Sequence, residues 1–408
     1  MRYFRKAFLV FGSVALFASF ILWFSPSLYS EGGYDVSTPN LENSLSGKTD
    51  GEPEEPEARK LPDLGPGGWE PLFELGEDIY PSVVISTATL KGGLWDDNDK
   101  EHLGDPWGFI GIVVRGVDDG SPIEVEISGG NFIHPSTFTG TLYDKNKIYC
   151  VYPSLKYDYE KLLAVRQTVP EMISFKVRIG NKTYPEKTVR VQVRPVNECV
   201  FYFDDSSGAG NDVSYFFAAY VNENHPLIDQ IMKEAIGYEL VDSFSGYQGD
   251  KEDVMSEIEA IWETLQRRGI HYSSIASSAA GDNPYVSTQP VRMVGDSINY
   301  SQSNCADGSV LLASIFRRIG LNTRLVILPD HMMVAVDLDE NGKETVYIET
   351  TMINDSTLGE AIKEGYDQYS ENKDRFDSEK EGDEDYHIAD IQNARSIGIM
   401  PIKDSSVK

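Results

Sequence analysis

Three residues in the C-terminal half of the chain have side chains suited to thiol chemistry: Cys305, His331 and Glu349. A cysteine nucleophile needs a base that accepts its proton, and the base needs a polar group that orients its ring. The chain has only three cysteines and six histidines, so few such combinations are available. We therefore predict Cys305 as the nucleophile, His331 as the base and Glu349 as the carboxylate that orients the base.

The cysteine lies at the start of a predicted helix. Ser303 or Asn304 suits the N-cap, apolar residues then recur at helical spacing, and Gly320 suits the C-terminal end. Cys305 falls in the first turn, where the helix dipole and the free N–H groups favour a thiolate. Asp307 falls in the same turn, and its negative charge opposes a thiolate. The dipole alone is therefore insufficient, and a neighbouring imidazolium is needed.

The histidine begins one predicted strand, which continues over residues 332–338, and the glutamate lies in the next, residues 345–351. Side chains alternate between the two faces of a strand, so the loop length decides whether two residues share a face. A two-residue Asn-Gly loop would put His331 and Glu349 on opposite faces. A loop of three or five residues, or a bulge, would put them on one face. The catalytic hypothesis therefore predicts an odd-length or bulged hairpin.

These residues also lie within longer motifs. The motifs are Asn304-Cys305-Ala306-Asp307-Gly308, Leu311-Leu312-Ala313, Arg318-Ile319-Gly320-Leu321, His331 and Tyr347-Ile348-Glu349-Thr350-Thr351. Together they resemble the transglutaminase-like fold, which is similar to that of papain-like cysteine proteases, over about residues 210–356. The resemblance implies the same three roles for Cys305, His331 and Glu349, although the family often has Asp at the third position. Reactions across the family include cross-linking, deamidation and peptide or amide hydrolysis, and some members lack activity.

Acyl transfer also needs hydrogen-bond donors for the negative oxygen that forms during the reaction. The backbone N–H of Cys305 is one expected donor, and the side chain of Gln302 or Gln289 is a candidate for the second. The histidines are scattered and show no metal-ligand spacing. The predicted chemistry therefore uses no metal and no cofactor.

The N-terminus carries a membrane signal. Residues 7–24 form an apolar run without a charge, close to the ~20 residues that a spanning helix needs. Arg2, Arg5 and Lys6 precede the run, and acidic residues follow it, which favours a cytoplasmic N-terminus at residues 1–6 and a body outside the membrane. We expect an uncleaved single-pass anchor. A cleaved signal peptide is the alternative, with Ser25 and Ser27 as small residues near a cleavage site.

The composition limits the partners. The formal net charge is -29, which makes nucleic acid a poor partner. Such acidity suits a body outside the membrane that stays off anionic surfaces. Cys150 and Cys199 form a disulfide in an oxidising compartment or remain two buried free thiols, and the sequence leaves both alternatives open.

The rest of the chain divides by composition. Residues 25–68 are rich in Gly, Pro, Ser and Glu and predict a disordered linker. Residues 69–205 contain short β-rich runs separated by turns, which predicts a β-sandwich-like domain that serves as a spacer or a partner-binding module. The runs are 82–89, 109–114, 123–128, 147–151, 173–179, 188–193 and 199–203.

The transglutaminase-like domain is expected at residues 206–356 and begins with two amphipathic helices, 226–240 and 251–268. Residues 357–408 are expected to hold an acidic loop, centred on 371–385, and a C-terminal segment that docks back onto a domain. The predicted fold class is α+β, with a transglutaminase-like or papain-like core preceded by the β-sandwich-like domain and the transmembrane helix.

Two functions fit these predictions. The first is thiol-dependent acyl transfer or amide hydrolysis outside the membrane, on a protein, a peptide or a cell-wall polymer, through Cys305, His331 and Glu349. The second is a catalytically silent domain of the same fold that binds a partner. They differ in whether the sulfur of Cys305 and the ring of His331 come within hydrogen-bonding reach.

Overall fold

The computed structural model describes residues 59–95, 99–273, 283–376 and 385–404, which fall in the unit Glu57–Lys408. They form a mixed α+β fold. The predicted cytoplasmic N-terminus, residues 1–6, and the predicted membrane span, residues 7–24, lie outside this part of the chain. Within the described ranges, no helix is both long and apolar enough to cross a membrane.

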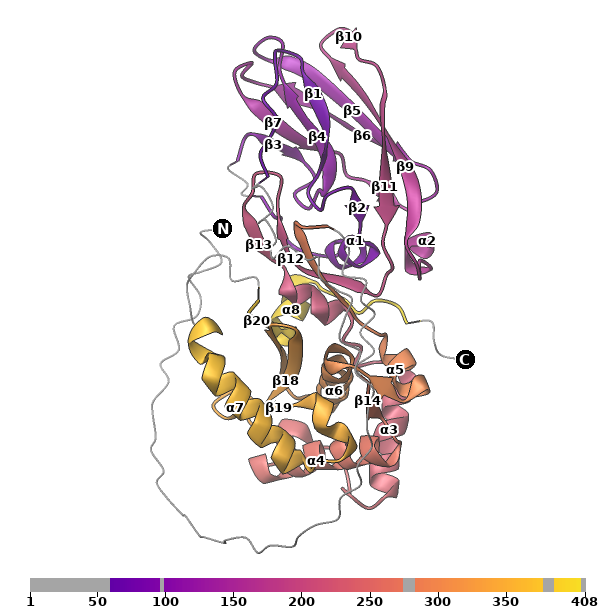
Figure 1. The fold of residues 1–408 in the computed structure, drawn as a ribbon, viewed down its shortest axis with the longest axis vertical. Helices are drawn as coiled ribbons and strands as arrows, with labels where there is room; N and C mark the ends of the chain where they lie inside the picture. The colour runs from indigo at the N-terminus through magenta and orange to yellow at the C-terminus, as the bar shows by residue number, and fades with distance from the viewer. Residues whose placement is uncertain (1–58, 96–98, 274–282, 377–384, 405–408) are drawn as a thin grey trace, which may run out of the picture. The chain divides into compact units, whose positions relative to one another are not determined.

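The first part of the chain builds two β-sheets (Figure 1). One has the strand order β1-β4-β7-β3, and the other has the order β2-β11-β9-β5-β6-β8 with β10 paired to β9. Their strands are Trp69–Phe73 (β1), Asp78–Ile79 (β2), His102–Gly104 (β3), Ile110–Arg115 (β4), Ser121–Gly129 (β5), Ile133–Leu142 (β6), Ile148–Tyr152 (β7), Lys156–Tyr157 (β8), Val169–Ile179 (β9), Lys182–Thr183 (β10) and Lys187–Val193 (β11).

The two sheets share one hydrophobic core. Val125 and Ile127 of β5 and Phe175 of β9 are fully buried, as are Ile112 and Val114 of β4 in the other sheet, and all belong to one cluster. Inward apolar residues alternate with outward polar ones along β5, as expected of a sheet with one covered face.

One predicted strand is instead a helix. Residues Pro81–Thr87 form helix α1, so the prediction of a strand at 82–89 is wrong. Val83, Val84 and Ile85 favour a strand by intrinsic propensity, but Pro81 occupies the first turn, where its fixed φ suits a helix start. The helix packs against strand β12 (Glu198–Asp204), so tertiary packing overrides the propensity.

Strand β12 joins the two parts of the chain. It was predicted as the last strand of the β-sandwich, but it pairs with β13 (Gly210–Asp212) and β15 (Val286–Pro290) in a separate three-stranded sheet. Tyr80, the N-cap of α1, and Val83 within α1 share a hydrophobic cluster with Phe203 of β12 and with Phe217 of η2 (Ser214–Ala219). The predicted boundary between residues 205 and 206 therefore does not interrupt the core.

The segment before the first strand is packed as well. Residues 59–68 were predicted as part of a disordered linker, residues 25–68, and this is wrong for the described portion. Leu64 is buried. The guanidinium of Arg59 donates to the carbonyls of Phe73, Glu74 and Asp204 at 2.5, 2.6 and 2.9 Å. The guanidinium of Arg115 also donates to the carbonyl of Leu64 at 3.0 Å. Composition alone misses such anchoring, because it depends on individual contacts with distant residues.

The second part of the chain is built around a four-stranded sheet with the order β19-β18-β17-β20. The strands are Thr323–Leu328 (β17), His331–Asp337 (β18), Thr345–Ile348 (β19) and His387–Asp390 (β20). Helix α6 (Cys305–Ile319) covers one face of this sheet and helix α7 (Leu358–Phe376) covers the other (Figure 1). Val334 and Val336 of β18 lie in the cluster with α6, whereas Met333 and Ala335 pack with Tyr369 of α7.

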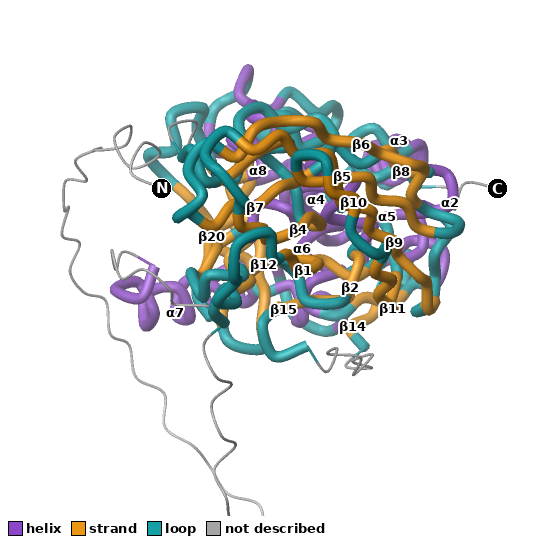
Figure 2. The backbone as a smooth tube through the Cα atoms, turned by 90° about the horizontal axis from the view of Figure 1, so that it is seen from above, coloured by secondary structure: helices purple, strands orange, loops and turns teal. Residues whose placement is uncertain are grey.

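The remaining elements surround this sheet, and α7 lies apart from the other labelled helices (Figure 2). The predicted helices at 226–240 and 251–268 are confirmed, each within a few residues. The other elements are Tyr159–Leu163 (α2), Pro226–Gly237 (α3), Lys251–Arg267 (α4), Val294–Tyr300 (α5), Ile391–Ile397 (α8), His271–Tyr272 (β14), Gln302–Ser303 (β16) and the 3-10 helices Ser214–Ala219 (η2), Gly246–Gln248 (η3) and Thr350–Asn354 (η4).

The C-terminal residues are structured differently from the prediction. Residues 371–376 continue α7, so the predicted acidic loop at 371–385 is wrong over that stretch, and residues 377–384 lie outside the described residues. The mean charge of this stretch conceals Phe376, which packs in one cluster with Tyr369 and Tyr386. The segment after it adds β20 to the edge of β17, so this part of the chain docks on the sheet.

Helix α7 approaches the sheet closely at Gly365. A Cβ atom on Gly365 would lie 2.6 Å from the carbonyl oxygen of Tyr347 in β19. Such a contact is shorter than van der Waals packing permits, so only glycine fits without a shift of the helix. By contrast, a Cβ atom on Gly359 in the first turn of the same helix would meet nothing within 4 Å.

These two glycines provide a matched test of the docking of α7. Gly365→Ala should lower the free energy of unfolding by about 1–3 kcal/mol, because the cost of overpacking exceeds the gain in helix propensity. Gly359→Ala should leave it unchanged or raise it slightly. Urea unfolding followed by circular dichroism measures both. Equal stabilisation by the two substitutions would show that α7 does not lie this close to β19.

Candidate active site

The predicted nucleophile is held at a capped helix start. Cys305 is the first residue of α6, and Asn304 is the N-cap. The side chain of Asn304 accepts a hydrogen bond from the backbone N–H of Asp307 at 2.8 Å, and the Asp307 carboxylate accepts one from the N–H of Asn304 at 3.1 Å. This capping box fixes the first turn. The predicted start at Cys305 and the predicted end at Gly320, which has a φ of 103°, are both confirmed.

The acidic residue in this turn has a basic partner that the sequence analysis missed. Asp307 accepts the backbone N–H of Arg292 at 2.7 Å, and the Arg292 guanidinium lies 3.5 Å from its carboxylate. Burial raises the pKa of Asp307, against the lowering effect of the hydrogen bonds and of the Arg292 charge. The expected opposition between Asp307 and a thiolate at Cys305 is therefore reduced by Arg292.

The first turn of α6 docks directly onto the chain beside the other two residues. The Cys305 carbonyl accepts hydrogen bonds from the hydroxyls of Ser309 at 2.8 Å and Thr350 at 3.2 Å. The Ser309 hydroxyl also lies 3.2 Å from the carbonyl of Met332. A Cβ atom on Gly308 would lie 3.1 Å from the Thr350 hydroxyl, so a small residue there permits the approach. Cys305 is thus tied to the neighbours of both His331 and Glu349.

The hairpin between β18 and β19 has the predicted odd-length loop. Asp337 pairs with Thr345, and the N–H of Leu338 donates to the carbonyl of Glu344, which leaves a loop of residues 339–343. Extending this register places Glu349 opposite residue 333, and therefore on the same face as His331. Gly342 has a φ of 65° and supplies the left-handed position. The prediction of an odd-length hairpin is confirmed.

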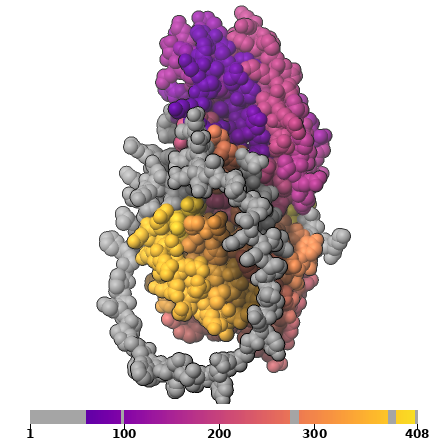
Figure 3. Space-filling view, viewed as in Figure 1, coloured from indigo at the N-terminus to yellow at the C-terminus, as the bar shows by residue number. Residues whose placement is uncertain are grey.

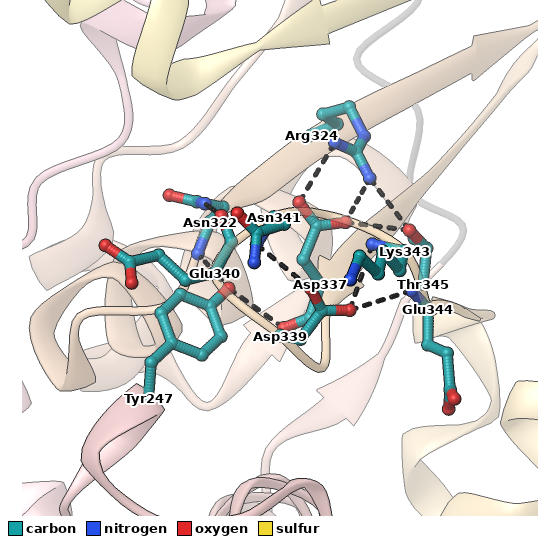
Figure 4. A network of polar contacts seen from close by, with 10 residues as sticks. All are labelled: Tyr247, Asn322, Arg324, Asp337, Asp339, Glu340, Asn341, Lys343, Glu344 and Thr345. Atoms are coloured by element: carbon teal, nitrogen blue, oxygen red, sulfur yellow. Dashed lines mark hydrogen bonds and ion pairs between the residues drawn. The ribbon is translucent and has the colours of Figure 1, made fainter. Parts of the chain in front are cut away.

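Polar contacts fix that loop (Figure 4). The carboxylate of Asp339 accepts three backbone N–H groups, from Asn341, Lys343 and Glu344, at 2.9–3.0 Å. Arg324 of β17 forms an ion pair with Asp337 at the end of β18. Because a one-residue slip would turn Glu349 to the other face, these contacts maintain the register on which the site depends.

His331 begins β18 directly after a two-residue turn. Leu328 pairs with His331, so Pro329 and Asp330 form the turn. Pro329 presets the first φ value, and Asp330 has a positive φ of 55°, which costs a non-glycine residue on the order of 1 kcal/mol. The strained turn therefore sets the position at which His331 begins β18.

The His331 ring is hydrogen-bonded to Glu349 and lies close enough to Cys305 for that thiol to affect its pKa. Its Nε2 lies 2.6 Å from Oε2 of Glu349. Burial would lower the pKa of His331, but hydrogen bonds to Cys305 and Glu349, together with the charges of those groups, raise it to about 10. Since Glu349 occupies Nε2, Nδ1 is the ring nitrogen left for the sulfur. The structure therefore brings Cys305, His331 and Glu349 together in the predicted order.

Glu349 is buried, and both of its carboxylate oxygens are engaged. Oε1 accepts the backbone N–H and the hydroxyl of Thr351 at 2.9 and 2.5 Å, and Oε2 accepts Nε2 of Gln368 at 3.1 Å beside His331. Burial would raise the pKa of Glu349, but the hydrogen bonds from His331 and Thr351 and the charge of His331 hold it below its usual range. The carboxylate therefore stays ionised and oriented. Glu349 was predicted within a strand, but β19 ends at Ile348 and Glu349 caps the 3-10 helix η4.

Tyr272 flanks the site and was missed by the sequence analysis. Its strand β14 runs beside β16, where Tyr272 pairs with Ser303, two residues before the cysteine. Its N–H donates to the side chain of Asn354 at the end of η4, at 2.8 Å. Burial raises the pKa of Tyr272, and so do the charges of Cys305 and Glu349. A two-residue strand has no periodic pattern that would have revealed it.

The two glutamines proposed as oxyanion donors differ in position. Gln302 lies in β16, three residues before Cys305, with an exposed side chain, and its carbonyl accepts Nη1 of Arg292 at 2.9 Å. Gln289 lies in β15 opposite Cys199, and its side chain donates to the Pro290 carbonyl at 2.9 Å. The Gln302 side chain is thus exposed close to Cys305 in sequence, whereas the Gln289 amide is engaged with its own strand.

The three cysteines differ in their surroundings. All lie in the described residues and all are free thiols, so Cys150 and Cys199 are two buried thiols and not a disulfide. Burial, with a smaller effect of the Glu74 charge, raises the pKa of Cys150 to about 12. Burial also raises the pKa of Cys199 well above its usual value. In contrast, Cys305 is only partly buried. Among the described residues, no group of three or more His, Cys, Asp or Glu side chains is placed to hold a metal ion.

Comparison with known proteins assigns no family to this chain. A scan against models of protein families finds no match, and a search of curated proteins finds none at a significant level. The proposal of a function therefore depends on the geometry of Cys305, His331 and Glu349.

The first test concerns thiol reactivity. Cys305 should be the only thiol that iodoacetamide alkylates rapidly at pH 6, since Cys150 and Cys199 are buried and protonated. An unassisted thiol with a pKa of ~8.5 is under about one per cent ionised at that pH, so His331→Ala should slow Cys305 alkylation roughly a hundredfold. Mass spectrometry of each cysteine peptide measures the rates. Equal rates for all three, with no effect of the substitution, would eliminate the thiol–imidazole pair.

The second test concerns Glu349. Glu349→Gln keeps the shape but replaces one acceptor oxygen by a donor and removes the charge, so acylation of Cys305 by an amide-mimic probe should fall by about two to four orders of magnitude. Glu349→Asp should retain part of the rate, because the charge remains although the reach is shorter. Probe incorporation with time, beside circular dichroism, gives both results. An undiminished rate in Glu349→Gln would assign Glu349 a structural role only.

Proposed function

We propose that this chain is a cysteine-dependent enzyme of the transglutaminase-like or papain-like type, which transfers acyl groups or hydrolyses amides. The substrate class is a protein, a peptide or a cell-wall polymer. The observation that carries the proposal is that the His331 ring has Glu349 at 2.6 Å from its Nε2 and is close enough to Cys305 for that thiol to raise its pKa. A capped helix that starts at the nucleophile, packed on a sheet that carries the base, supports the proposed class.

The first step forms the tetrahedral intermediate that precedes the thioester. The Cys305 thiolate attacks the carbonyl carbon of the amide, and the carbonyl electron pair moves to the oxygen. The negative oxygen accepts hydrogen bonds from the backbone N–H of Cys305 and from a second donor, for which Gln302 and Tyr272 are the candidates. The second donor must hydrogen-bond to the oxygen only when the negative charge forms on it. An exposed side chain such as that of Gln302 is free to move onto this oxygen after the substrate has bound.

The second step releases the amine. Protonated His331 gives its proton to the departing nitrogen, the C–N bond breaks, and the acyl group remains on sulfur as a thioester. Neutral His331 then takes a proton from water or from an incoming amine as it attacks the thioester. The C–S bond breaks, the thiolate returns, and the product is a carboxylic acid or a new amide. Glu349 stabilises the imidazolium in both directions.

The proposed location is outside the membrane. It rests on residues 7–24 as a single-pass anchor with residues 1–6 in the cytoplasm, and on the net charge of -29. The packing of residues 59–68, with Arg59 bound to three backbone carbonyls, would attach the folded body firmly to the chain that leads from such an anchor.

A thiol-reactive amide-mimic probe tests the proposal. The probe should label Cys305 in the full chain held in membranes, and proteomics of captured acyl intermediates should identify the substrate. Because the leaving amine needs the His331 proton, the rate at which the probe labels Cys305 should fall as the pH rises through about 10, where His331 loses that proton. His331→Ala should abolish labelling at neutral pH.

The same experiment separates the two candidate functions. If the probe labels wild-type protein no faster than His331→Ala, the chain is a catalytically silent, partner-binding domain. Cys305→Ala is the control for labelling at other residues.

A further inference from the structure

Helix α7 covers the side of the sheet on which the base and the carboxylate lie. Residues alternate along β18, and Met333 and Ala335 pack with Tyr369 of α7, so His331 belongs to the same face. Glu349 falls on this face by the same register. The nucleophile comes from α6 on the opposite face, and the three meet at the end of the sheet. Helix α7 therefore covers the face of the sheet to which His331 and Glu349 belong.

Three residues at helical spacing on α7 meet the chain at Glu349. The backbone N–H of Glu349 donates to the carbonyl of Ala361 at 3.0 Å. Gly365 allows the helix backbone to approach Tyr347, two residues before Glu349. One turn further on, Nε2 of Gln368 donates to Oε2 of Glu349 at 3.1 Å. Positions 361, 365 and 368 lie on one side of a helix, so a single docked face makes all three contacts.

Aromatic stacking fixes the rotation of α7 about its axis. The rings of Tyr369 and Tyr347 in β19 lie 3.9 Å apart between centroids, and Phe376 at the end of the helix lies 5.7 Å from Tyr386, just before β20. Tyr369 directly follows Gln368, so these ring contacts determine where the Gln368 side chain points. Figure 3 shows the yellow residues of the C-terminal part on the surface of the molecule, and Gln368 is only partly buried. Its place against Glu349 therefore depends on the helix and not on deep burial.

The amide group of Gln368 has a defined orientation. Its Nε2 donates to Glu349 and also to Oε1 of Glu364 at 3.1 Å. Both partners are carboxylates that accept hydrogen bonds, so the NH2 end and not the oxygen must face them. The amide does not titrate, and it supplies a donor to the oxygen that His331 also uses. Such a hydrogen bond favours the ionised carboxylate.

We propose that Gln368 is a positioning residue of the active site, through which helix α7 keeps Glu349 charged and directed at His331. The inference rests on the proposed thiol-enzyme function. It extends the functional unit beyond residue 356, where the family resemblance ends, to a helix that the sequence motifs do not include. Without the Gln368 donor, Glu349 would take up a proton at a higher pH as the solution is acidified. The thiolate–imidazolium pair would then also be lost at a higher pH.

The test compares three substitutions on α7 in the full-length protein. Gln368→Met keeps the side-chain length without the donor, Gln368→Glu adds a like charge beside Glu349, and Lys363→Ala changes an exposed residue that pairs with Asp367. The measured quantity is the rate of Cys305 alkylation by iodoacetamide from pH 4 to pH 9. The acid limb is the low-pH part of this profile, where the alkylation rate falls as the pH decreases. Gln368→Met should move this limb to higher pH by about one unit, so that the alkylation rate at a given pH on the limb falls about tenfold. Gln368→Glu should move it further, and Lys363→Ala should not move it.

The outcomes separate this inference from the proposed function. A purely structural role for Gln368 would lower the melting temperature of Gln368→Met and leave the pH profile unchanged, which would overturn the inference alone. If wild-type Cys305 alkylation does not depend on His331, the proposed function fails and the inference falls with it. If the acid limb moves in both Gln368 variants while the melting temperature of Gln368→Met stays within a few degrees of wild type, the positioning role is established.

Discussion

The hydrogen-bonded carboxylate of Glu349 is the interaction on which the candidate site depends. It is buried, yet four donor groups reach it: the N–H and hydroxyl of Thr351, the ring of His331 and the amide of Gln368. A buried charge with fewer partners would be neutralised by protonation. With these partners it remains ionised, and it can hold an imidazolium beside the Cys305 sulfur. The chemistry proposed here therefore begins with how this carboxylate is surrounded.

Three separate elements must be correctly placed to create those surroundings. The loop of residues 339–343 sets the register that turns Glu349 toward His331. The first turn of α6 docks on Thr350 and delivers Cys305 from the other face of the sheet. Helix α7 closes the face that carries His331 and Glu349. Each contact is local, but the three elements take these relative positions only on the complete four-stranded sheet. The site is therefore a property of the assembled core.

Sequence reasoning predicted the parts of the site that follow local rules. The capped start of α6 follows from Asn304. The odd hairpin loop follows from strand alternation once His331 and Glu349 are assumed to share a face. It failed where tertiary contacts decide: the β-branched stretch after Pro81 is a helix, residues 59–68 are anchored by Arg59, and the acidic stretch at 371–376 is part of α7. Gln368 and Tyr272 could not be predicted, because each reaches the site across many residues of chain and belongs to no local pattern.

The central claim is that His331 carries a proton at neutral pH because it lies between a thiolate and Glu349. Nitrogen NMR of imidazole-labelled protein measures this directly, with the His331 signals assigned by their loss in His331→Ala. The account predicts that both ring nitrogens are protonated at pH 7 and that the ring titrates with a pKa of about 10, returning toward the ordinary value of 6.5 in Glu349→Gln. A neutral His331 ring at pH 7 in the wild-type protein would contradict it.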